Sequence, residues 1–482
     1  NFVNDVMKYN NLGAGSIYDK PESSATQWSL MSYLARINYS LYDRYLFSVN
    51  GRVDGSSRFG GNNKYGFFPS GSVAWRISEE GFMEPVKAVI NNLKLRTSYG
   101  FTGNTEIGVY ESLATLGSNS WTIGNQLVSG FYPNRIPNPD LKWEKTGQFD
   151  IGFDLGLFNN RLRLTADYYY KKTTDLLYNV AIPSASGYDS MLKNIGSVQN
   201  KGYELSIESD NLSGAFSWTT AFNISFNRNK VLELGGETYK DVGTYDDHLK
   251  TSDIRRLIVG QPIGVFYGYR FDGIFQNEAE CAQQTSSPSP IGVGLRRYKD
   301  LNGDGKIDAT NDREILGDAN PKFFGGMTNT FAYKGFELNV FLQYSYGNKI
   351  FNYNAMELES PTGGQNVYQD LVNRWTPTNP SNEYQKATTN RNNIVSDRFI
   401  EDGSFLKLKT VSLSYSFPKL NWKHIGGLRL YVTGQNLLTW TKYRGYDPEV
   451  SYRGASTLEA GEDFGGYPQA RTFMFGIKLD IK

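Results

Sequence analysis

The sequence predicts an all-β fold, the C-terminal portion of a transmembrane antiparallel β-barrel with long extracellular loops. Three observations lead to this prediction. Many segments alternate apolar and polar residues with a period of two, as strands with one apolar and one wet face do. These segments run for about 10 to 13 residues, near what a tilted strand needs to cross a bilayer. The connections alternate between short turns and long loops, as in outer-membrane barrels.

The alternation is clearest in FSWTTAFNISF, residues 216–226. Its even-numbered residues share one face and are apolar apart from Thr220, whereas its odd-numbered residues are Ser, Thr, Ala and Asn. Segments 148–157, 161–170 and 335–347 show the same division. The polar face is too consistently small and hydrophilic for a dry core, and a water-filled lumen fits it.

Thirteen such segments follow one another along the chain. They are 28–40, 45–55, 67–77, 92–102, 144–157, 161–175, 201–210, 216–226, 323–333, 335–347, 404–417, 427–441 and 471–482. The long connections are 103–143, 176–200, 227–322, 348–403 and 442–470. A slip of the apolar phase predicts a β-bulge near Thr410. Residues 78–92 predict a short helix within a turn.

The strand count and direction predict a larger barrel. If the last strand ends in the periplasm, the odd-numbered strands run toward it, and residues 1–27 are expected outside the cell. An odd number of strands does not close a bacterial barrel, and an open one leaves unpaired edges in lipid at several kcal/mol per group. We therefore expect the chain, 1–482, to be the C-terminal part of a barrel. No run of about 18 apolar residues predicts a transmembrane helix.

Composition narrows the classes of function. Aromatic residues make up 15% of the chain and glycine occurs 50 times, while hydrophobic residues reach only 39%. This mixture favours a barrel, although a soluble β-sandwich could share it. The 50 basic and 49 acidic residues leave a formal net charge of +1, so no nucleic-acid partner is expected. The single cysteine, Cys281, excludes an intrachain disulfide and a Cys-based metal site.

The chain is predicted not to be an enzyme. Its two histidines, His248 and His424, are far apart in sequence and in different predicted loops, so a histidine metal site or a catalytic triad is not expected. No phosphate-binding loop or GxSxG motif occurs. Adjacent carboxylates such as Glu79 and Glu80 are of the residue type that glycosidases use for catalysis. Loops of this composition usually carry solvated charge, so catalysis by such a pair is not expected.

The stretch DLNGDGKID, residues 300–308, predicts a calcium loop. Oxygen ligands occur at alternate positions, and Gly305 at the sixth allows the sharp bend. The twelfth position is Asn311 instead of the usual Glu, and the next residue can close the site. The predicted ligands are Asp300, Asn302, Asp304, Lys306 through its carbonyl, Asp308 and Asp312. We expect a structural Ca²⁺ in the long loop 227–322; the alternatives are a metal-free turn and calcium-dependent sugar binding.

Ordered motifs along nearly the whole chain carry a family resemblance. They include SSRFGGNNKYGFFPSGSVAWRISEE (56–80), LKLRTSYGFTGN (93–104), NPDLKWEKTGQFDIGFDLGLFNNRLRLTADYYYKKTTDLL (138–177), NIGSVQNKGYELSI (194–207), GVFYGYRFDGIFQ (264–276), DLNGDGKIDATNDREILGDANPKFFGG (300–326), SDRFIEDGSFLKLKTVSLSYSFP (396–418), GQNLLTWTKYRGYDPEV (434–450) and YPQARTFMFGIKLDIK (467–482). Together they resemble the SusC/RagA-like TonB-dependent transporters of Bacteroidota outer membranes.

The resemblance implies a barrel of 22 strands, of which these would be the last thirteen. It also implies an N-terminal plug domain and a periplasmic TonB box, neither of which is expected within this chain, and a SusD-like surface lipoprotein as partner. The implied activity is TonB-dependent import of a nutrient across the outer membrane of a Gram-negative bacterium. Glycan is the favoured substrate and oligopeptide the runner-up. A calcium-stabilised surface adhesin and a passive porin are the rival hypotheses.

Four aromatic residues of the predicted external loops are candidates for stacking on sugar rings. They are Trp121, Tyr132, Trp375 and Tyr452. Lipid-interface belts and loop packing are the alternative explanation for aromatic residues in a barrel. The sequence singles out no other substrate-binding residue.

Overall fold

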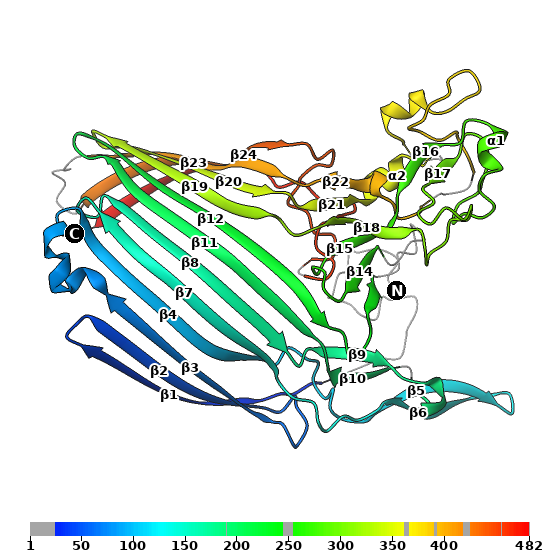
Figure 1. Cartoon of the computed structure of the whole chain (residues 1–482), viewed down its shortest axis with the longest axis horizontal. Coiled ribbons are helices and arrows are strands. Elements are labelled where there is room, and N and C mark those ends of the chain that lie inside the picture. Colours follow the sequence, from blue (N-terminus) through cyan, green and yellow to red (C-terminus); the bar gives the residue numbers. More distant parts are fainter. Residues whose placement is uncertain are drawn as a thin grey trace, which may run out of the picture.

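The computed structural model describes residues 25–188, 190–243, 254–360, 366–389, 393–417, 425–454 and 456–481. One antiparallel sheet of 13 strands forms the wall of the molecule, and its strands neighbour one another in chain order (Figure 1). The strands are β1 (Leu30–Leu41), β2 (Tyr45–Ser56), β3 (Tyr65–Arg76), β4 (Ile90–Asn104), β7 (Glu144–Leu157), β8 (Leu162–Thr174), β11 (Ser197–Leu212), β12 (Phe216–Glu233), β19 (Phe323–Tyr333), β20 (Phe336–Tyr346), β23 (Phe405–Ser416), β24 (Ile425–Thr441) and β26 (Thr472–Ile481). Each of the thirteen predicted segments overlaps one of these strands, so the predicted fold class is confirmed.

The two faces of the sheet differ in polarity, as the alternation predicts. Residues directly opposite each other on neighbouring strands share a face. Phe226 lies opposite Tyr203, and Phe222 lies opposite Met327, so apolar side chains line up across strands. Tyr203 is 63% exposed. This apolar, solvent-exposed face is the outer face, which lipid covers in a membrane barrel.

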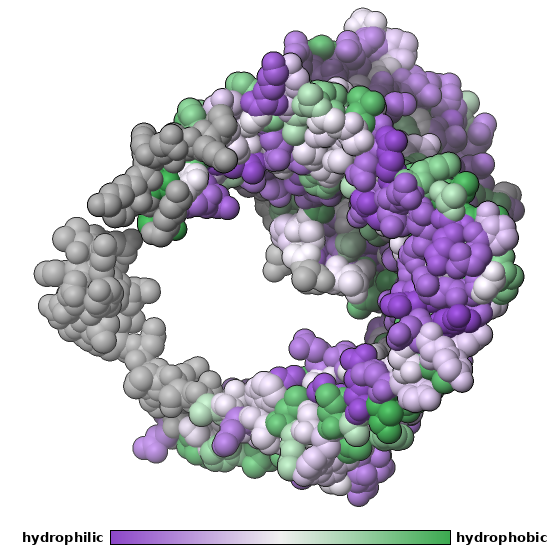
Figure 2. All heavy atoms as spheres, turned by 90° about the vertical axis from the view of Figure 1, so that its left-hand side faces the viewer, coloured by the Kyte–Doolittle hydropathy of each residue, from purple (hydrophilic) through white to green (hydrophobic). Residues whose placement is uncertain are grey.

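The inner face carries charged side chains that are paired with one another. Lys94 on β4 lies 3.0 Å from Asp154 on β7 (Nζ to Oδ2), and Arg96 lies 2.7 Å from Asp167 on β8 (Nη2 to Oδ1). Seen from the short-turn end, the sheet curves around a central hollow (Figure 2). The wall therefore presents apolar residues outward and compensated polar residues inward.

The two ends of the sheet differ in their connections. At the short-turn end, the chain reverses through left-handed residues, such as Lys334 with φ 47° and Gly335 with φ 88°. The predicted short helix in this region is present as two 3₁₀ helices, Ile77–Glu79 and Gly81–Val86. The long connections gather at the opposite end (Figure 1).

The predicted bulge lies in β23 at Lys409. Leu408 pairs with Leu342 on β20 and Thr410 pairs with Phe341, so Lys409 has no partner residue on that strand. Lys409 points inward, as Lys407 does. Because Lys409 is an extra residue, the alternation beyond it resumes with the opposite phase. The prediction from the phase slip is thus confirmed to within one residue.

The long connections contain elements that the sequence analysis treated only as loops. Their strands are β5 (Thr115–Ile123), β6 (Gln126–Arg135), β9 (Leu177–Ala181), β10 (Ser190–Asn194), β13 (Tyr239–Val242), β14 (Arg255–Ile258), β15 (Val265–Tyr269), β16 (Phe271–Ile274), β17 (Arg296–Tyr298), β18 (Arg313–Asp318), β21 (Lys349–Asn352), β22 (Ile400–Asp402) and β25 (Glu462–Asp463). The helices are α1 (Glu278–Cys281) and α2 (Tyr353–Leu358), with 3₁₀ helices at Ser184–Ser186, Gln369–Asn373 and Asp397–Phe399. None of the helices in the described part of the chain has the length and hydropathy to span a membrane.

The sheet ends in two edge strands. β1 and β26 occupy the two ends of the strand order, and within the described residues each pairs with a neighbour on one side only. The larger barrel of 22 strands stays a prediction, as do the expected positions of residues 1–24, which lie outside the described ranges.

Candidate functional site

Three of the long connections pack into one body at the end of the wall, here called the loop body. Its core combines residues from three connections that are far apart in the sequence. The buried members are Ile254, Phe266, Phe351, Tyr353, Ala355, Met356, Val395 and Phe399, and Phe464 packs against them. Apolar burial thus joins 254–322, 349–403 and 442–466 into a single unit, which Figure 1 places beside the ends of the strands.

A buried ion pair joins the first and third of these connections. Arg255 on β14 lies 3.1 Å from Glu462 on β25 (Nε to Oε1), and each side chain is 2% exposed. Arg255 also donates hydrogen bonds to the carbonyls of Gly264 and Ala460. Burial raises the pKa of Glu462 and lowers that of Arg255, and the attraction between the two charges opposes both shifts. Removing Glu462 would leave the Arg255 charge buried without its partner, and removing Arg255 would leave Glu462 with Arg453 alone, at 3.7 Å (Nε to Oε2).

A second charged cluster joins the second and third of these connections. Glu359 is almost fully buried and accepts hydrogen bonds from Arg398 at 2.7 Å and from Arg444 at 3.1 Å. Arg444 also lies 2.9 Å from Glu401 (Nη2 to Oε1). Burial alone would lower the pKa of Arg444, but the hydrogen bonds and negative charges of Glu401 and Glu359 raise it overall. The guanidinium therefore stays charged and fixes the geometry of both carboxylates.

A third cluster fastens the loop body to the wall. Lys407 on β23 is 1% exposed and lies 2.6 Å from Asp447 (Nζ to Oδ1) and 2.5 Å from Glu449 (Nζ to Oε2). Lys409, at the bulge, reaches Glu449 at 2.8 Å. Burial alone would raise the pKa of Asp447 and of Glu449, but hydrogen bonds from the lysines lower both overall. The bulge thus directs two ammonium groups toward one loop.

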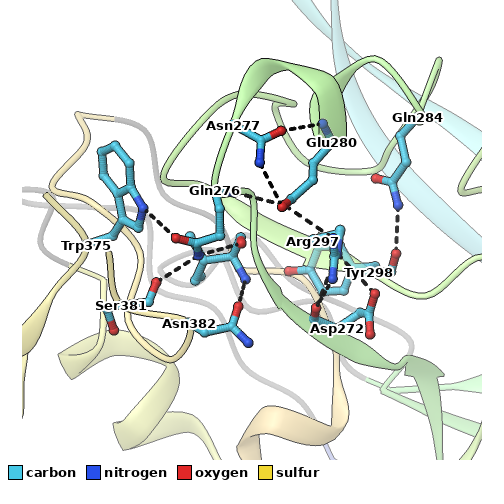
Figure 3. A network of polar contacts seen from close by, with 11 residues as sticks. Asp272, Gln276, Asn277, Glu280, Gln284, Arg297, Tyr298, Trp375, Ser381 and Asn382 are labelled. Carbon is cyan, nitrogen blue, oxygen red and sulfur yellow. Dashed lines mark hydrogen bonds and ion pairs between the residues drawn. The ribbon is translucent and has the colours of Figure 1, made fainter. Parts of the chain in front are cut away.

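A polar network accounts for the position of Trp375, one of the four aromatic candidates (Figure 3). The Trp375 indole donates to the Gln276 side-chain oxygen at 3.1 Å, and the Gln276 amide donates to the Ser381 carbonyl at 3.1 Å. The Trp375 ring also covers the α-carbon of Gly294, where an added Cβ would lie 2.5 Å from it. Trp375 is therefore engaged in packing within the loop body.

The other aromatic candidates have different surroundings. Tyr452 packs against Tyr353 and Phe464, with ring centroids 6.4 and 5.3 Å apart. Trp121 and Tyr132 are 58% and 43% exposed on the β5–β6 hairpin. The two rings lie on the same face of the hairpin, and each covers a glycine of the opposite strand. Among the four candidates, only Trp121 and Tyr132 have strongly exposed rings that each pack over a glycine of the neighbouring strand.

The predicted calcium ligands all lie on the connection between β17 and β18. The Asp300 carboxylate accepts hydrogen bonds from the backbone N–H of Gly303 at 2.6 Å and of Gly305 at 2.7 Å. Asp312 is fully buried and accepts from Asp308 N–H at 2.8 Å. Hydrogen bonds from the backbone hold the pKa of Asp300 and of Asp308 below the usual range.

Throughout the described ranges, His, Cys, Asp and Glu side chains form no group of three or more that could hold a metal ion. The carboxylates of the loop accept hydrogen bonds from its own backbone. Calcium binding by Asp300, Asn302, Asp304, Lys306, Asp308 and Asp312 therefore stays a prediction.

Two other residues singled out from the sequence, Glu80 and Cys281, have clear positions. Glu80 accepts hydrogen bonds from Arg44 at 3.1 Å and from Tyr45 at 2.7 Å, so it is engaged in structure at the short-turn end. Cys281 is buried at the end of α1, where burial raises the pKa of its thiol. The histidines, His248 and His424, lie outside the described residues.

A cavity of about 490 Å³ on the inner face was not predicted. It lies where β11 and β12 meet the loop body, and its amide-bearing lining residues include Asn200, Asn227 and Asn229. Leu257 and Leu458 from two loops close its apolar side. Asparagines at alternate inward positions near a strand end were the signal in the sequence that could have pointed to it.

The chain is similar to proteins of one family. It matches the model described as TonB dependent receptor-like, beta-barrel, over residues 2–273. It is 41% identical to TonB-dependent receptor P3 of Formosa agariphila over 99% of this chain and 48% of that protein. It is 32% identical to TonB-dependent receptor SusC of Bacteroides thetaiotaomicron over 95% of this chain and 44% of that protein.

A solved structure gives the same result. The structure of the RagAB peptide transporter matches with a TM-score of 0.81 at 28% identity, covering 96% of this chain and 49% of that chain. The chain thus spans about half the length of the curated relatives it matches. The predicted resemblance to SusC/RagA-like transporters is confirmed.

Proposed function

Because this chain belongs to the TonB-dependent receptor-like β-barrel family, we propose that it forms part of an active nutrient importer in the outer membrane of a Gram-negative bacterium. The carrying observation is the loop body, which three buried charge clusters hold together and fasten to the wall at the long-loop end. The polar inner face of the wall supports passage of a hydrophilic substrate.

We favour a neutral glycan as the substrate class, with an oligopeptide as the alternative. The cavity beside β11 and β12 supports this choice, because Glu233 is the single charged residue among the described residues that line it. The amides of Asn200 and Asn227 can exchange hydrogen bonds with sugar hydroxyls, and the Tyr178 ring offers an apolar surface. A peptide with charged termini would call for charged partners in the lining.

The partners follow from the same proposal. A SusD-like lipoprotein would sit on the loop body and deliver substrate to the cavity below. The plug domain and the coupling to TonB would come from segments or chains beyond the residues of this chain. Ca²⁺ would have a structural role in the 300–312 loop, and no catalytic step is proposed for the chain.

Uptake by cells tests this proposal. The full-length transporter would be restored to a deletion strain, and uptake of labelled oligosaccharides and labelled oligopeptides would be compared with and without a protonophore. We expect protonophore-sensitive uptake of oligosaccharide, reduced by Asn227→Leu. Uptake that resists the protonophore would favour a passive porin, and uptake of peptide alone would favour the alternative substrate.

The adhesin hypothesis needs a separate experiment. A membrane barrel should require detergent for extraction and should migrate differently on a gel before and after heating. Extraction without detergent, together with unchanged migration, would favour the soluble, calcium-stabilised adhesin over the importer.

A further inference from the structure

A patch of nine residues lies on the outer face of β8, β11 and β12 near the long-loop end, and is here called the basic patch. The register arranges it in three rows across the strands. The rows are Tyr168–Tyr203–Phe226, then Tyr170–Lys201–Arg228, then Lys172–Gln199–Lys230. An aromatic row is thus followed, toward the loops, by two rows that contain four cations.

The direction of these side chains follows from their neighbours. Lys201 and Arg228 line the same surface hollow of about 340 Å³ as Tyr203 and Phe226, which belong to the apolar outer face. The alternate residues Asn200, Asn227 and Asn229 line the cavity on the inner face. The basic patch therefore lies on the outer surface of the wall, at the level where a barrel passes from hydrocarbon to headgroups.

The cations of the basic patch lack acidic partners. Among the described residues, Lys172, Lys201, Arg228 and Lys230 form no ion pair, and the three rows contain no Asp or Glu. Arg228 donates one hydrogen bond to each of two carbonyls, those of Asn227 at 2.8 Å and Lys322 at 2.9 Å. On the inner face, by contrast, Lys94 and Arg96 are both paired with aspartates.

The spacing of the patch suits one kind of anion. Lys201 and Arg228 are directly opposite on neighbouring strands, where Cβ atoms lie about 5 Å apart, so both head groups can reach one phosphate. The aromatic row lies on the hydrocarbon side, where the acyl chains of the same molecule would pack. Juxtamembrane cations near an interface attract anionic lipid headgroups.

We propose that the basic patch binds the phosphate of a lipid headgroup in the extracellular leaflet, with Lys201 and Arg228 as its main contacts. This inference rests on the proposed location in the outer membrane. The ligand is a phosphorylated glycolipid of the lipid A type, whose phosphate supplies the missing negative charge and whose acyl chains cover the Tyr168–Tyr203–Phe226 row.

The test compares lipid retention by the full-length transporter and two variants. The first variant changes all four cations, Lys172→Gln, Lys201→Gln, Arg228→Gln and Lys230→Gln. The matched control is Lys171→Gln, because Lys171 is on the same strand but the opposite face, with its ammonium over the Tyr169 ring. Each protein would be purified in detergent and the lipid A bound per molecule measured by mass spectrometry, then titrated with lipid A.

We expect the control to retain lipid A like the unchanged protein and the fourfold variant to bind it at least about tenfold more weakly. Dephosphorylated lipid A should bind the unchanged protein as weakly as lipid A binds the fourfold variant. Equal retention by all three proteins, or equal binding of dephosphorylated lipid A, would overturn the proposal. Displacement by millimolar inorganic phosphate would also overturn it, by indicating a site for free phosphate.

Two further measurements keep the result interpretable. Heat-dependent migration on a gel reports whether the fourfold variant folds, and a variant with Lys201→Arg alone should retain lipid A, because it keeps the charge. Nutrient uptake is measured separately in cells. If the unchanged protein binds lipid A but imports no nutrient, the import proposal is refuted and the lipid proposal stands. If it imports nutrient but all three proteins retain lipid A equally, the lipid proposal is refuted and the import proposal stands.

Discussion

Lys407 donates a hydrogen bond to Asp447 at 2.6 Å, and the two side chains are 1% and 9% exposed. The lysine belongs to the wall, two residues before the bulge of β23, and the aspartate belongs to the connection between β24 and β26. A buried charge that loses its partner costs free energy, so the two side chains must stay together. This contact therefore couples the position of the loop body to the wall.

Replacing Lys407 by Met should release this connection. Asp447 would remain buried without its cation, while the partly buried Glu449 would keep Lys409, and we expect a loss of about 3–5 kcal/mol in the free energy of loop docking. Limited proteolysis would show faster cleavage within 442–470, while heat-dependent migration of the barrel stays unchanged. Lys409→Met is the matched control, since Lys409 is 27% exposed and contacts only Glu449 among these carboxylates. Equal cleavage of both variants would contradict the assignment.

Acid should release the same loop. The pKa values of Asp447 and Glu449 are lowered from 3.8 and 4.5 in the folded protein, so their stabilising contribution is present above these ordinary values and lost as the pH falls through the lowered ones. We expect protease resistance of 442–470 to be constant above about pH 5 and to fall below about pH 4. A protein with Lys407→Met should show a flatter profile. A loss of resistance near neutral pH in the unchanged protein would point to different groups.

The Arg255–Glu462 pair permits a double-mutant cycle. Arg255→Met alone leaves Glu462 buried with only the more distant Arg453, 3.7 Å away (Nε to Oε2), as a cationic partner, so we expect a loss of about 3–5 kcal/mol in the stability of the loop body. Adding Glu462→Leu should recover most of that loss, because two apolar groups of similar volume replace the pair. Thermal unfolding of the loop body, followed by near-ultraviolet circular dichroism, measures both. Additive losses in the double variant would show that the pair is not coupled.

Calcium binding predicts an effect of chelator on the 276–322 segment. If an ion links the carboxylates of the 300–312 loop, chelation should speed proteolysis of this segment, and Asp304→Ala should have the same effect without chelator. Asp272→Ala, in the same connection but outside the predicted ligands, is the control. Unchanged cleavage with and without chelator would favour the metal-free turn, in which backbone N–H groups satisfy Asp300.

The wall could be predicted from sequence because its signal is local. Alternation identifies β12 from Phe216, but the prediction ends at Phe226 whereas the strand continues to Glu233. The outward positions that follow are Arg228 and Lys230, so the strand leaves the hydrocarbon level and loses its apolar signal while its backbone pairing continues. The bulge at Lys409 was predictable for the same reason, since a phase slip is visible over a few residues.

The loop body could not be predicted because its contacts are not local. β21 pairs in parallel with β25, whose two residues are Glu462 and Asp463, and so short a strand shows no periodicity. Arg255 and Glu462 are separated by 207 positions, and a single sequence gives no sign that they meet. The cavity beside Asn227 depends on the same long-range packing. Strand and turn were therefore predictable, but the architecture of the mouth was not.

The strand order also has a consequence for how the molecule assembles. Each strand of the wall pairs with the next strand of the wall along the chain, so the wall can grow by successive hairpins as they emerge. The loop body assembles later than the wall strands. Arg255 can pair with Glu462 only after Glu462 has been synthesised, and Glu462 comes shortly before the last strand. The mouth can acquire its final shape only when the wall is nearly complete, so a partly built wall would carry unassembled loops and no finished surface for a partner.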